Sequence, residues 1–380
     1  MENFVFENPT RLIFGKNTIP KIGEEIKKAK IKKVLFLAGR GSIKRNRVYQ
    51  KVVRSLQENK ISWVEVWGVQ PNPVLSKVRE GIKTARREKV QAVLAVGGGS
   101  VIDSGKAICA GVYLKDIWQA FEGKVKIERA LPLFVVLTLS ATASEMNQWA
   151  VLTNEEEKKK FGLGSRHFYP RVSIVDPTAQ YSLPWEQVVN GAIDGISHIM
   201  ENYFLGKGEE ASLAYNESLI LSIIEAVDKI QENPRDYQAR ANLCWCITLA
   251  HNGFAGAGLS GGDWSAHRIE HSISALYPRV AHGKGLAVVF PAWLLYMQRY
   301  NPKTFLRFAR NVWRAKSVEG AVKKMRRKYK SWGAPVRLRE LGIREKDIPA
   351  LVENAMLFPS LGVLKRLNKK DVKEILKLAL

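Results

Sequence analysis

The chain has 380 residues, of which 46% are hydrophobic, 9% aromatic and 25% charged; this composition is typical of a globular protein and excludes a disordered or low-complexity chain. Its length is large for one hydrophobic core and favours two domains. Of the formal net charge of +24, 14 charges fall from position 301 onward, where basic and apolar residues alternate at helical spacing; we interpret them as solvated faces of amphipathic helices rather than a nucleic-acid surface.

No segment combines the length and apolar character of a membrane span, and the N-terminal residues lack the basic and apolar regions of a signal peptide. We therefore expect a cytoplasmic protein with no nucleic-acid or membrane partner. The cysteines, Cys109, Cys244 and Cys246, are odd in number, and we interpret them as free thiols rather than as a metal or redox site.

Segments typical of strands and of helices alternate over the first 180 residues. Strand candidates are “KKVLFLAG”, “WVEVWGV” and “VQAVLAVGG”, and helix candidates between them are “RVYQKVVRSLQENK” and “VLSKVREGIKTARREK”. This alternation predicts βαβ units and a parallel sheet. After “DPTAQYSLPWEQ” the segments have helical periodicity with few strand candidates. We therefore predict an α/β domain over residues 1–184 and an all-helical domain over residues 185–380.

A basic, glycine-containing loop, “LAGRGSIKRN”, follows the first of these strands. In dinucleotide-binding enzymes an acidic residue after an early strand binds the ribose hydroxyls of the adenosine and repels a 2′-phosphate. This loop has no such residue, and Gly39, Arg40, Ser42 and Lys44 form a small cationic pocket instead. The pattern favours NADP over NAD; the alternative interpretation is an exposed basic turn.

A second glycine turn, “AVGGGSVIDSGKAI”, leads from a predicted strand directly into a helix. Glycines allow a backbone to approach a phosphate closely, and the first N–H groups of a helix are unpaired and favour an anion. We predict that Gly97, Gly98, Gly99 and Ser100 bind a pyrophosphate. The turn matches neither the G-x-G-x-x-G fingerprint nor a P-loop, so a purely structural turn stays open.

Four histidines and one aspartate form a pattern typical of a metal site. Asp194 and His198 are four residues apart in “DGISHIME”, which places them together on one helix face. His267 and His271 have the same spacing in “HRIEH”, and His282 follows in “AHGKG”. One carboxylate and several imidazoles with no cysteine nearby suit Fe(II) or Zn(II). Three histidines and the aspartate as ligands leave one position open for a substrate oxygen.

“HRIEH” also fits H-x-x-E-H, the pattern of inverted zinc peptidases, in which both histidines bind zinc and Glu270 is the general base. The pattern is short and arises often by chance. A peptidase would also leave Asp194, His198 and the glycine turns without a role. A zinc metallopeptidase is therefore kept as a remote alternative.

Taken together, the motifs resemble the iron-containing (group III) alcohol dehydrogenases, and among them the NADPH-dependent butanol dehydrogenase and aldehyde reductase branch. The resemblance rests on “FENPTRLIFGKNTI”, “GVQPNPVLSKVREG”, “AVGGGSVIDSGKAI”, “LTLSATASEMNQWAVLTNEEEKKKFG”, “SIVDPTAQYSLP”, “GAIDGISHIMENYF” and “HRIEHSISALYPRVAHGKGLAVVFPAW” and covers about residues 3–300. It implies a Rossmann-like dinucleotide-binding domain and an all-α metal-binding domain, the dehydroquinate synthase-like fold. It implies reversible hydride transfer between NADP(H) and primary alcohols or aldehydes, and we expect a homodimer.

The resemblance also implies a role for each matching residue. One divalent ion, Fe(II) or Zn(II), is held by Asp194, His198, His267 and His282. His271 lies near the nicotinamide and is the catalytic candidate, as a proton relay, with packing against the cofactor as its alternative role. The residues expected to bind the cofactor are Gly39, Arg40, Ser42, Asn72, Gly97, Gly98, Gly99, Ser100, Asp103, Thr138, Thr142, Asn147 and Lys160.

Arg40 departs from the family pattern, because the related reductases usually have three glycines before the Ser-Ile-Lys motif. A polyol or glycerol-type dehydrogenase of the same superfamily is the nearest alternative function. Trp149, Phe254 and Trp264 are candidates for an apolar substrate pocket, but they could equally be core residues.

Overall fold

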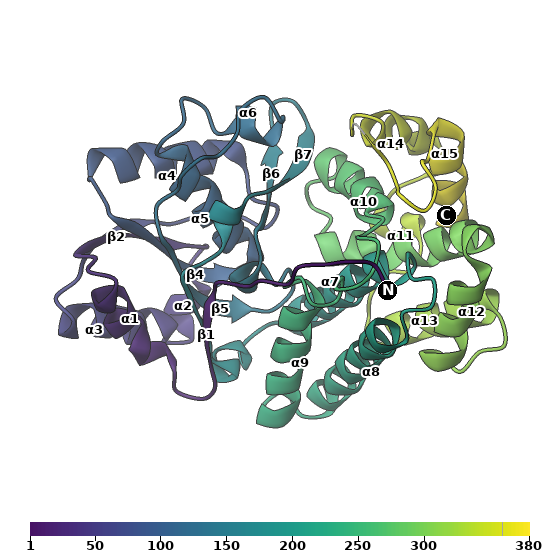
Figure 1. Ribbon diagram of the computed structural model, residues 1–380, viewed down its shortest axis with the longest axis horizontal. Helices are drawn as coiled ribbons and strands as arrows, with labels where there is room; N and C mark the ends of the chain where they lie inside the picture. Colours follow the sequence, from purple (N-terminus) through teal and green to yellow (C-terminus); the bar gives the residue numbers. More distant parts are fainter. Residues whose placement is uncertain (359) are drawn as a thin grey trace. The chain divides into compact units, whose positions relative to one another are not determined.

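The computed structural model describes residues 1–358 and 360–380, and the chain forms two compact units. The α/β unit comprises Glu7–Leu183 and Asn233–Thr248, and the helical unit comprises Met1–Phe6, Pro184–Glu232 and Leu249–Leu380. In Figure 1 the strands and helices of the α/β unit are mostly purple and blue, and the helices of the helical unit run from teal to yellow.

A six-stranded parallel sheet forms the centre of the α/β unit. In spatial order its strands are β1 (Arg11–Phe14), β8 (Val172–Val175), β5 (Leu133–Leu139), β4 (Ala92–Gly98), β2 (Lys33–Ala38) and β3 (Ser62–Val66). The four inner strands are buried almost throughout, because helices cover both faces of a parallel sheet. This explains why their sequences are mostly apolar, with few polar residues such as Thr138 and Ser173.

Helices pack on both faces of the sheet. α1 (Ile22–Lys28) and α3 (Val48–Glu58) cover the face on which Phe36 of β2 is buried, and α4 (Leu75–Arg87) and α5 (Gly99–Gly111) cover the face of Leu37. The alternation follows from the two-residue period of a strand. The smaller elements are η1 (Ile19–Lys21), α2 (Ser42–Arg45), α6 (Trp118–Phe121), η2 (Ser144–Met146), the antiparallel hairpin β6 (Trp149–Asn154) and β7 (Lys159–Gly164), η3 (Arg166–Phe168) and η4 (Pro177–Gln180).

The path of the chain reverses between β2 and β4. From β2 the chain proceeds outward to β3, then returns past β2 to β4 and continues to β5 on the other side. β2 and β4 are hydrogen-bonded neighbours, so the loops that follow them diverge at the carboxyl edge of the sheet. Open α/β sheets bind ligands at such a switch point. Residues 39–42 follow β2, and residues 97–100 span the end of β4 and the start of α5; both segments, singled out from the sequence, lie on either side of this point.

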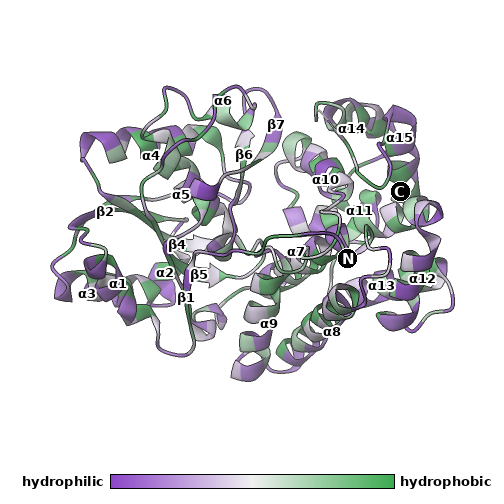
Figure 2. Ribbon diagram, viewed as in Figure 1, coloured by the Kyte–Doolittle hydropathy of each residue, from purple (hydrophilic) through white to green (hydrophobic). Residues whose placement is uncertain are grey.

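The helical unit contains only helices among its described residues. They are α7 (Trp185–Tyr203), α8 (Glu210–Glu232), α10 (Ser265–Leu276), α11 (His282–Met297), η5 (Gln298–Tyr300), α12 (Pro302–Asn311), α13 (Val318–Ser331), η6 (Leu338–Leu341), η7 (Glu345–Asp347), α14 (Ile348–Ala355) and α15 (Lys369–Leu378). α11 packs against both α7 and α10. Figure 2 shows α8 and α12 alternating between purple and green, as expected of amphipathic helices. None of the described helices is both long and apolar enough to cross a membrane.

Two segments cross the boundary that the sequence predicts near residue 184. Most of α9 (Tyr237–Ala250) belongs to the α/β unit, where its Trp245 ring lies 6.1 Å from the Phe14 ring. Conversely, Met1–Phe6 belongs to the helical unit. Helical periodicity shows which face of a helix is apolar, but not which body that face packs against. The predicted fold class, an α/β dinucleotide-binding type of sheet followed by helices, is confirmed.

Candidate metal centre and dinucleotide site

Two of the predicted metal ligands share one face of α7. Asp194 and His198 lie one helical turn apart and are 3% and 6% exposed. His198 Nε2 lies 3.7 Å from Asp194 Oδ1. The spacing read from the sequence therefore brings both side chains to one point inside the helical unit.

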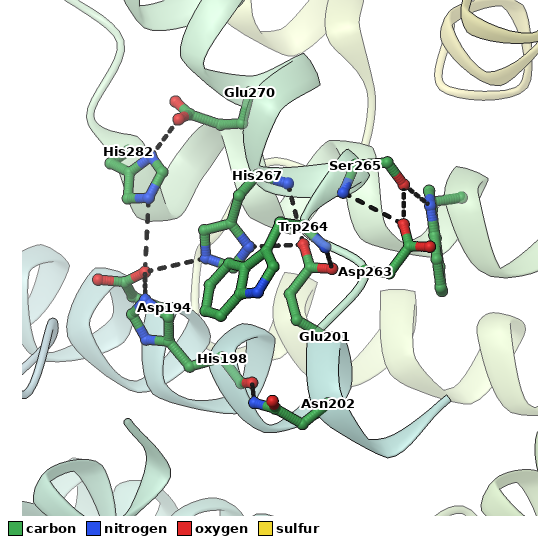
Figure 3. Close-up of polar contacts among 11 residues, drawn as sticks. Asp194, His198, Glu201, Asn202, Asp263, Trp264, Ser265, His267, Glu270 and His282 are labelled. Atoms are coloured by element: carbon green, nitrogen blue, oxygen red, sulfur yellow. Dashed lines mark hydrogen bonds and ion pairs between the residues drawn. The ribbon is translucent and has the colours of Figure 1, made fainter. Parts of the chain in front are cut away.

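His267 on α10 and His282 at the start of α11 face the same carboxylate. Their Nε2 atoms lie 3.8 and 3.5 Å from Asp194 Oδ1, and ligand atoms of these two histidines and Asp194 all lie within 4.8 Å of one another. Figure 3 shows the imidazoles of His198, His267 and His282 arranged around the Asp194 carboxylate. All four predicted ligands therefore converge.

The donor set has the chemistry and the spacing of a divalent metal site. Separations of 3.5–3.8 Å are too long for good hydrogen bonds, whereas atoms bound at about 2.1 Å to a tetrahedral ion stand about 3.4 Å apart. Asp194 Oδ1 and His267 Nε2 are buried without a hydrogen-bond partner in the described part of the chain. Such an atom costs about 1–3 kcal/mol, and a bound cation removes that cost. The residues therefore fit one ion such as Fe(II) or Zn(II).

Two buried carboxylates support the imidazoles from behind. Glu201 Oε1 on α7 lies 2.7 Å from His267 Nδ1, and Glu270 Oε2 on α10 contacts His282 Nδ1. Both glutamates are 0% exposed. When Nδ1–H donates to a carboxylate, the ring is fixed and the Nε2 lone pair is left for a metal. Glu201 was not predicted from the sequence, and Glu270 was considered only as the general base of a peptidase, although each lies three positions after a predicted ligand histidine on the same helix.

Burial and neighbouring charges shift the pKa values of Asp194, His198 and His267. Burial alone raises the pKa of Asp194, but the surrounding histidines hold it well below its ordinary value. Burial lowers the pKa of His198 to about 3. Burial alone would also lower the pKa of His267, but Asp194 and Glu201 raise it to about 9. Because a metal binds neutral imidazole, a cation at this centre competes with a proton for His267.

Two further histidines lie beside the centre. His271, one turn after His267 on α10, is 8% exposed, and its ring lies 5.4 Å from the His282 ring. His251, for which the sequence predicts no role, stacks in parallel on His198 with ring centroids 4.4 Å apart. No spacing rule could have found His251, because it follows α9 and meets His198 only in the folded chain.

In the α/β unit, the turn of residues 97–100 joins β4 directly to α5. A Cβ atom at Gly97 would lie 2.5 Å from Val101 Cγ2, and one at Gly99 would lie 2.4 Å from Thr142 Oγ1. A larger residue would therefore clash at either position. α5 begins at Gly99, and its N-cap residue, Gly98, makes no side-chain cap hydrogen bond to the first N–H groups. Such groups at a helix start suit a pyrophosphate.

The other predicted cofactor residues belong to several elements of the α/β unit: Asp103 to α5, Thr138 to β5, Lys160 to β7, and Asn72, Thr142 and Asn147 to connecting segments. Asn147 Nδ2 donates to the Thr142 carbonyl oxygen at 3.0 Å, and Lys160 Nζ donates to Asn72 Oδ1 at 3.0 Å. Four of these side chains are nearly buried: Asp103 (6% exposed), Thr138 (7%), Asn147 (3%) and Lys160 (4%).

The basic loop after β2 contacts the loop after β3. The exposed Arg40 donates from Nη2 to Gln70 Oε1 at 2.8 Å, and the Gly68 N–H donates to the Gly39 carbonyl oxygen at 3.2 Å. Gly41 has a φ of +111°, a left-handed conformation that favours glycine. The structure therefore places the Arg40 guanidinium at the surface beside the switch point.

Comparisons with known proteins match nearly the whole chain. The family described as iron-containing alcohol dehydrogenase matches residues 9–177, and the C-terminal part of the Fe-containing alcohol dehydrogenase family matches residues 188–380. The chain belongs to the iron-containing alcohol dehydrogenase family. Membership confirms the predicted family and the reaction class, metal-dependent oxidoreduction of alcohols and aldehydes.

Members of the family are similar to the chain from end to end. The chain is 39% identical over 391 residues to the NADH-dependent butanol dehydrogenase A of Clostridium acetobutylicum, with 99% of each chain covered. It is 34% identical over 367 residues to an NADPH-dependent aldehyde reductase of Escherichia coli, covering 93% of this chain and 92% of the relative. The crystal structure of NADH-dependent butanol dehydrogenase A from Thermotoga maritima has a TM-score of 0.98 at 53% identity, covering 100% of this chain and 99% of that one.

In this structure the glutamate of “HRIEH”, Glu270, is not placed as the general base of a peptidase would be. Glu270 is fully buried, and its carboxylate contacts His282 Nδ1 and the Ser274 hydroxyl. A general base must reach the proton that it abstracts, and this carboxylate is already engaged by His282 and Ser274. The structure therefore does not favour the metallopeptidase.

Proposed function

We propose that the protein is a butanol dehydrogenase-like enzyme that transfers hydride reversibly between NADP(H) and primary alcohols or aldehydes, as a cytoplasmic homodimer. The observation that carries the proposal is the approach of three imidazole Nε2 atoms to within 3.5–3.8 Å of Asp194 Oδ1. Asp194, His198, His267 and His282 would hold one Fe(II) or Zn(II) ion. When bound, the ion supplies a Lewis acid that polarises an aldehyde carbonyl and lowers the pKa of an alcohol hydroxyl.

The residues of the chain bind the reactants and move the proton. In oxidation, the carbinol carbon gives a hydride to C4 of the oxidised nicotinamide and the hydroxyl gives up its proton; reduction reverses both transfers. His271 takes the hydroxyl proton and passes it to solvent, since an imidazole titrates near neutral pH. Its position, with the ring 5.4 Å from that of His282, supports this role.

The dinucleotide binds at the carboxyl edge of the sheet. Residues 97–100 receive the pyrophosphate and Asn72 lies on the adenosine side. Arg40, with Gly39 and Ser42, binds a 2′-phosphate, because the loop presents a guanidinium and no carboxylate. The relatives carry both preferences in their names: the clostridial enzyme is called NADH-dependent and the Escherichia coli reductase NADPH-dependent. NADH is therefore the second candidate.

The substrate is a small alcohol or aldehyde with an apolar chain. The Trp264 ring lies 5.3 Å from the His267 ring and 5.0 Å from the His251 ring, so an apolar surface adjoins the metal ligands. Phe254, another candidate from the sequence, packs on Tyr215 with ring centroids 4.6 Å apart. An indole beside the centre suits an alkyl chain better than the hydroxyls of a polyol.

The test is a panel of aldehydes and alcohols assayed with NADPH and with NADH on protein loaded separately with iron and with zinc. We expect metal-dependent reduction of short aliphatic aldehydes, faster with NADPH. Full activity after removal of the metal would contradict the mechanism. Faster turnover of glycerol than of butanol would support the polyol dehydrogenase instead, and preference for NADH would overturn the role of Arg40.

A further inference from the structure

A buried lysine on α5 has no role in the proposed site. Lys106 is 0% exposed. Its amine donates to the carbonyl oxygen and to Oδ1 of Asn147, both at 2.9 Å, and to the carbonyl oxygen of Trp149 at 2.7 Å. Burial of an amine is unfavourable unless hydrogen bonds compensate for the lost water. All three acceptors of Lys106 belong to one short segment of chain.

Asp103, three residues earlier on the same side of α5, binds the same segment. Its Oδ1 accepts from the Ser144 hydroxyl at 2.6 Å, and its Oδ2 accepts from the Val151 backbone N–H at 3.0 Å. We call residues 142–151 the clamped loop. Asp103 and Lys106 hold this loop near both of its ends and in its middle.

The clamped loop extends to the glycine turn. Asn147, held by Lys106, donates from Nδ2 to the Thr142 carbonyl oxygen at 3.0 Å. Thr142 in turn occupies the space where Gly99 would carry a side chain, 2.4 Å from the Cβ position. Between them Ala143 has a φ of +51°, a left-handed conformation that a non-glycine residue keeps only where its surroundings fix it. A continuous path of contacts therefore links Lys106 to the turn.

We infer that Lys106 is a positioning residue for the dinucleotide: through Asn147 it fixes the clamped loop against residues 97–100 and keeps the turn in its phosphate-binding shape. Packing alone does not require an amine, because a methionine of similar length would fill the same space. The amine adds orientation, since it aligns three oxygen acceptors of the clamped loop. The inference rests on the proposed function, because it takes residues 97–100 as the pyrophosphate site.

The test compares Lys106→Met with the wild-type protein, both full-length and metal-loaded, in titrations with NADPH and NADH. Loss of the three hydrogen bonds predicts dinucleotide binding that is weaker by about tenfold or more. The KM for the dinucleotide is expected to rise, while kcat at saturating dinucleotide changes by less than about twofold. Ser55→Ala is the matched control: Ser55 is buried in the same unit and bonds the Gly23 N–H and the Pro20 carbonyl oxygen, so its loss lowers stability without changing the Kd.

A double-mutant cycle separates positioning from general destabilisation. If Lys106 acts through Asn147, Asn147→Ala weakens binding much less in the Lys106→Met background than in the wild type. Unchanged dinucleotide affinity of Lys106→Met, or fully additive effects, overturns the inference. Should Lys106→Met fail to fold, Lys106→Gln keeps a donor with a shorter reach and is expected to bind weakly as well; wild-type affinity in that variant also overturns the inference. Failure of the wild-type protein to bind either dinucleotide overturns the proposed function instead.

Discussion

Glu201 Oε1 lies 2.7 Å from His267 Nδ1, and the two side chains come from different helices, α7 and α10. The carboxylate fixes the ring so that Nε2 faces Asp194. We expect Glu201→Gln to lower the metal affinity by about 10- to 100-fold, because a neutral carboxamide supports the imidazole less strongly. The measurement is a titration of metal-depleted protein with Zn(II) in competition with a chelator.

Glu217 provides a control for the loss of a buried carboxylate in the same unit. It is 7% exposed and accepts hydrogen bonds from the Tyr203 hydroxyl at 2.6 Å and from Asn311 Nδ2 at 2.9 Å. Glu217→Gln is therefore expected to lower stability and to leave the metal affinity unchanged within about twofold. Equal metal affinities of Glu201→Gln and the wild type would show that Glu201 does not support the ligand.

His267 and His271 share α10 but differ in their expected roles. His267→Ala removes a ligand, so metal content and activity are expected to fall together, to the level of the metal-depleted protein. His271→Ala is expected to keep the metal and to slow turnover by about 100-fold, the usual contribution of a proton-transfer group. Metal content is measured by elemental analysis on the same samples that are assayed. Loss of metal from His271→Ala would assign His271 to the ligand set.

The sequence predicts best what depends on local geometry. Asp194 and His198 are one helical turn apart, so the period of a helix alone brings them together. The turn at residues 97–100 was predicted for a similar reason. Consecutive glycines between a strand pattern and a helix pattern are typical of a tight strand-to-helix turn. That His282 reaches Asp194 from another helix, 3.5 Å away, follows from no local rule and was supplied by the family resemblance.

The supporting residues are harder to predict because they look ordinary in the sequence. Glu201, Glu270 and Lys106 are charged residues within helices, and charged helical residues usually face water. All three are 0% exposed, and each has a partner from another part of the chain. The position of α9 in the α/β unit was not predicted for the same reason, because the apolar pattern of a helix does not show which elements the helix packs against.

The proposed role of Arg40 leads to a prediction about the preference for NADPH over NADH. Arg40→Asp places a carboxylate where a 2′-phosphate would bind and is expected to shift the ratio of kcat/KM for NADPH over NADH towards NADH by about tenfold or more. Arg45→Asp is the control, because Arg45 is an exposed residue of the neighbouring α2 and the change in charge is the same. Equal shifts in both variants would assign the effect to the general charge of the unit, and an unchanged ratio in Arg40→Asp would remove Arg40 from cofactor recognition.

The burial of Lys106 leads to a prediction of how the free energy of unfolding depends on pH. Burial lowers the pKa of Lys106 from its ordinary value of 10.5 to about 7, although Asp103 and Glu145 nearby act to raise it. Between these two pH values the unfolded chain keeps a proton on this amine that the folded chain has released. The neutral amine has two N–H donors, so in this window it donates to two of its three oxygen acceptors, and all three are bonded only by the ammonium form at lower pH. Because the unfolded state then binds more protons, this group makes the free energy of unfolding rise with pH through that window, by at most about 1.4 kcal/mol per pH unit.

Urea denaturation from pH 7 to pH 10 measures this dependence, with Lys106→Met as the reference because it lacks the titrating amine and keeps every other ionisable group. The free energy of unfolding of the wild type minus that of the variant is expected to increase with pH across the window. Parallel curves would mean that the pKa of Lys106 keeps its ordinary value in the folded chain. The three oxygen acceptors on Asn147 and Trp149 would then hold the ammonium form despite its burial.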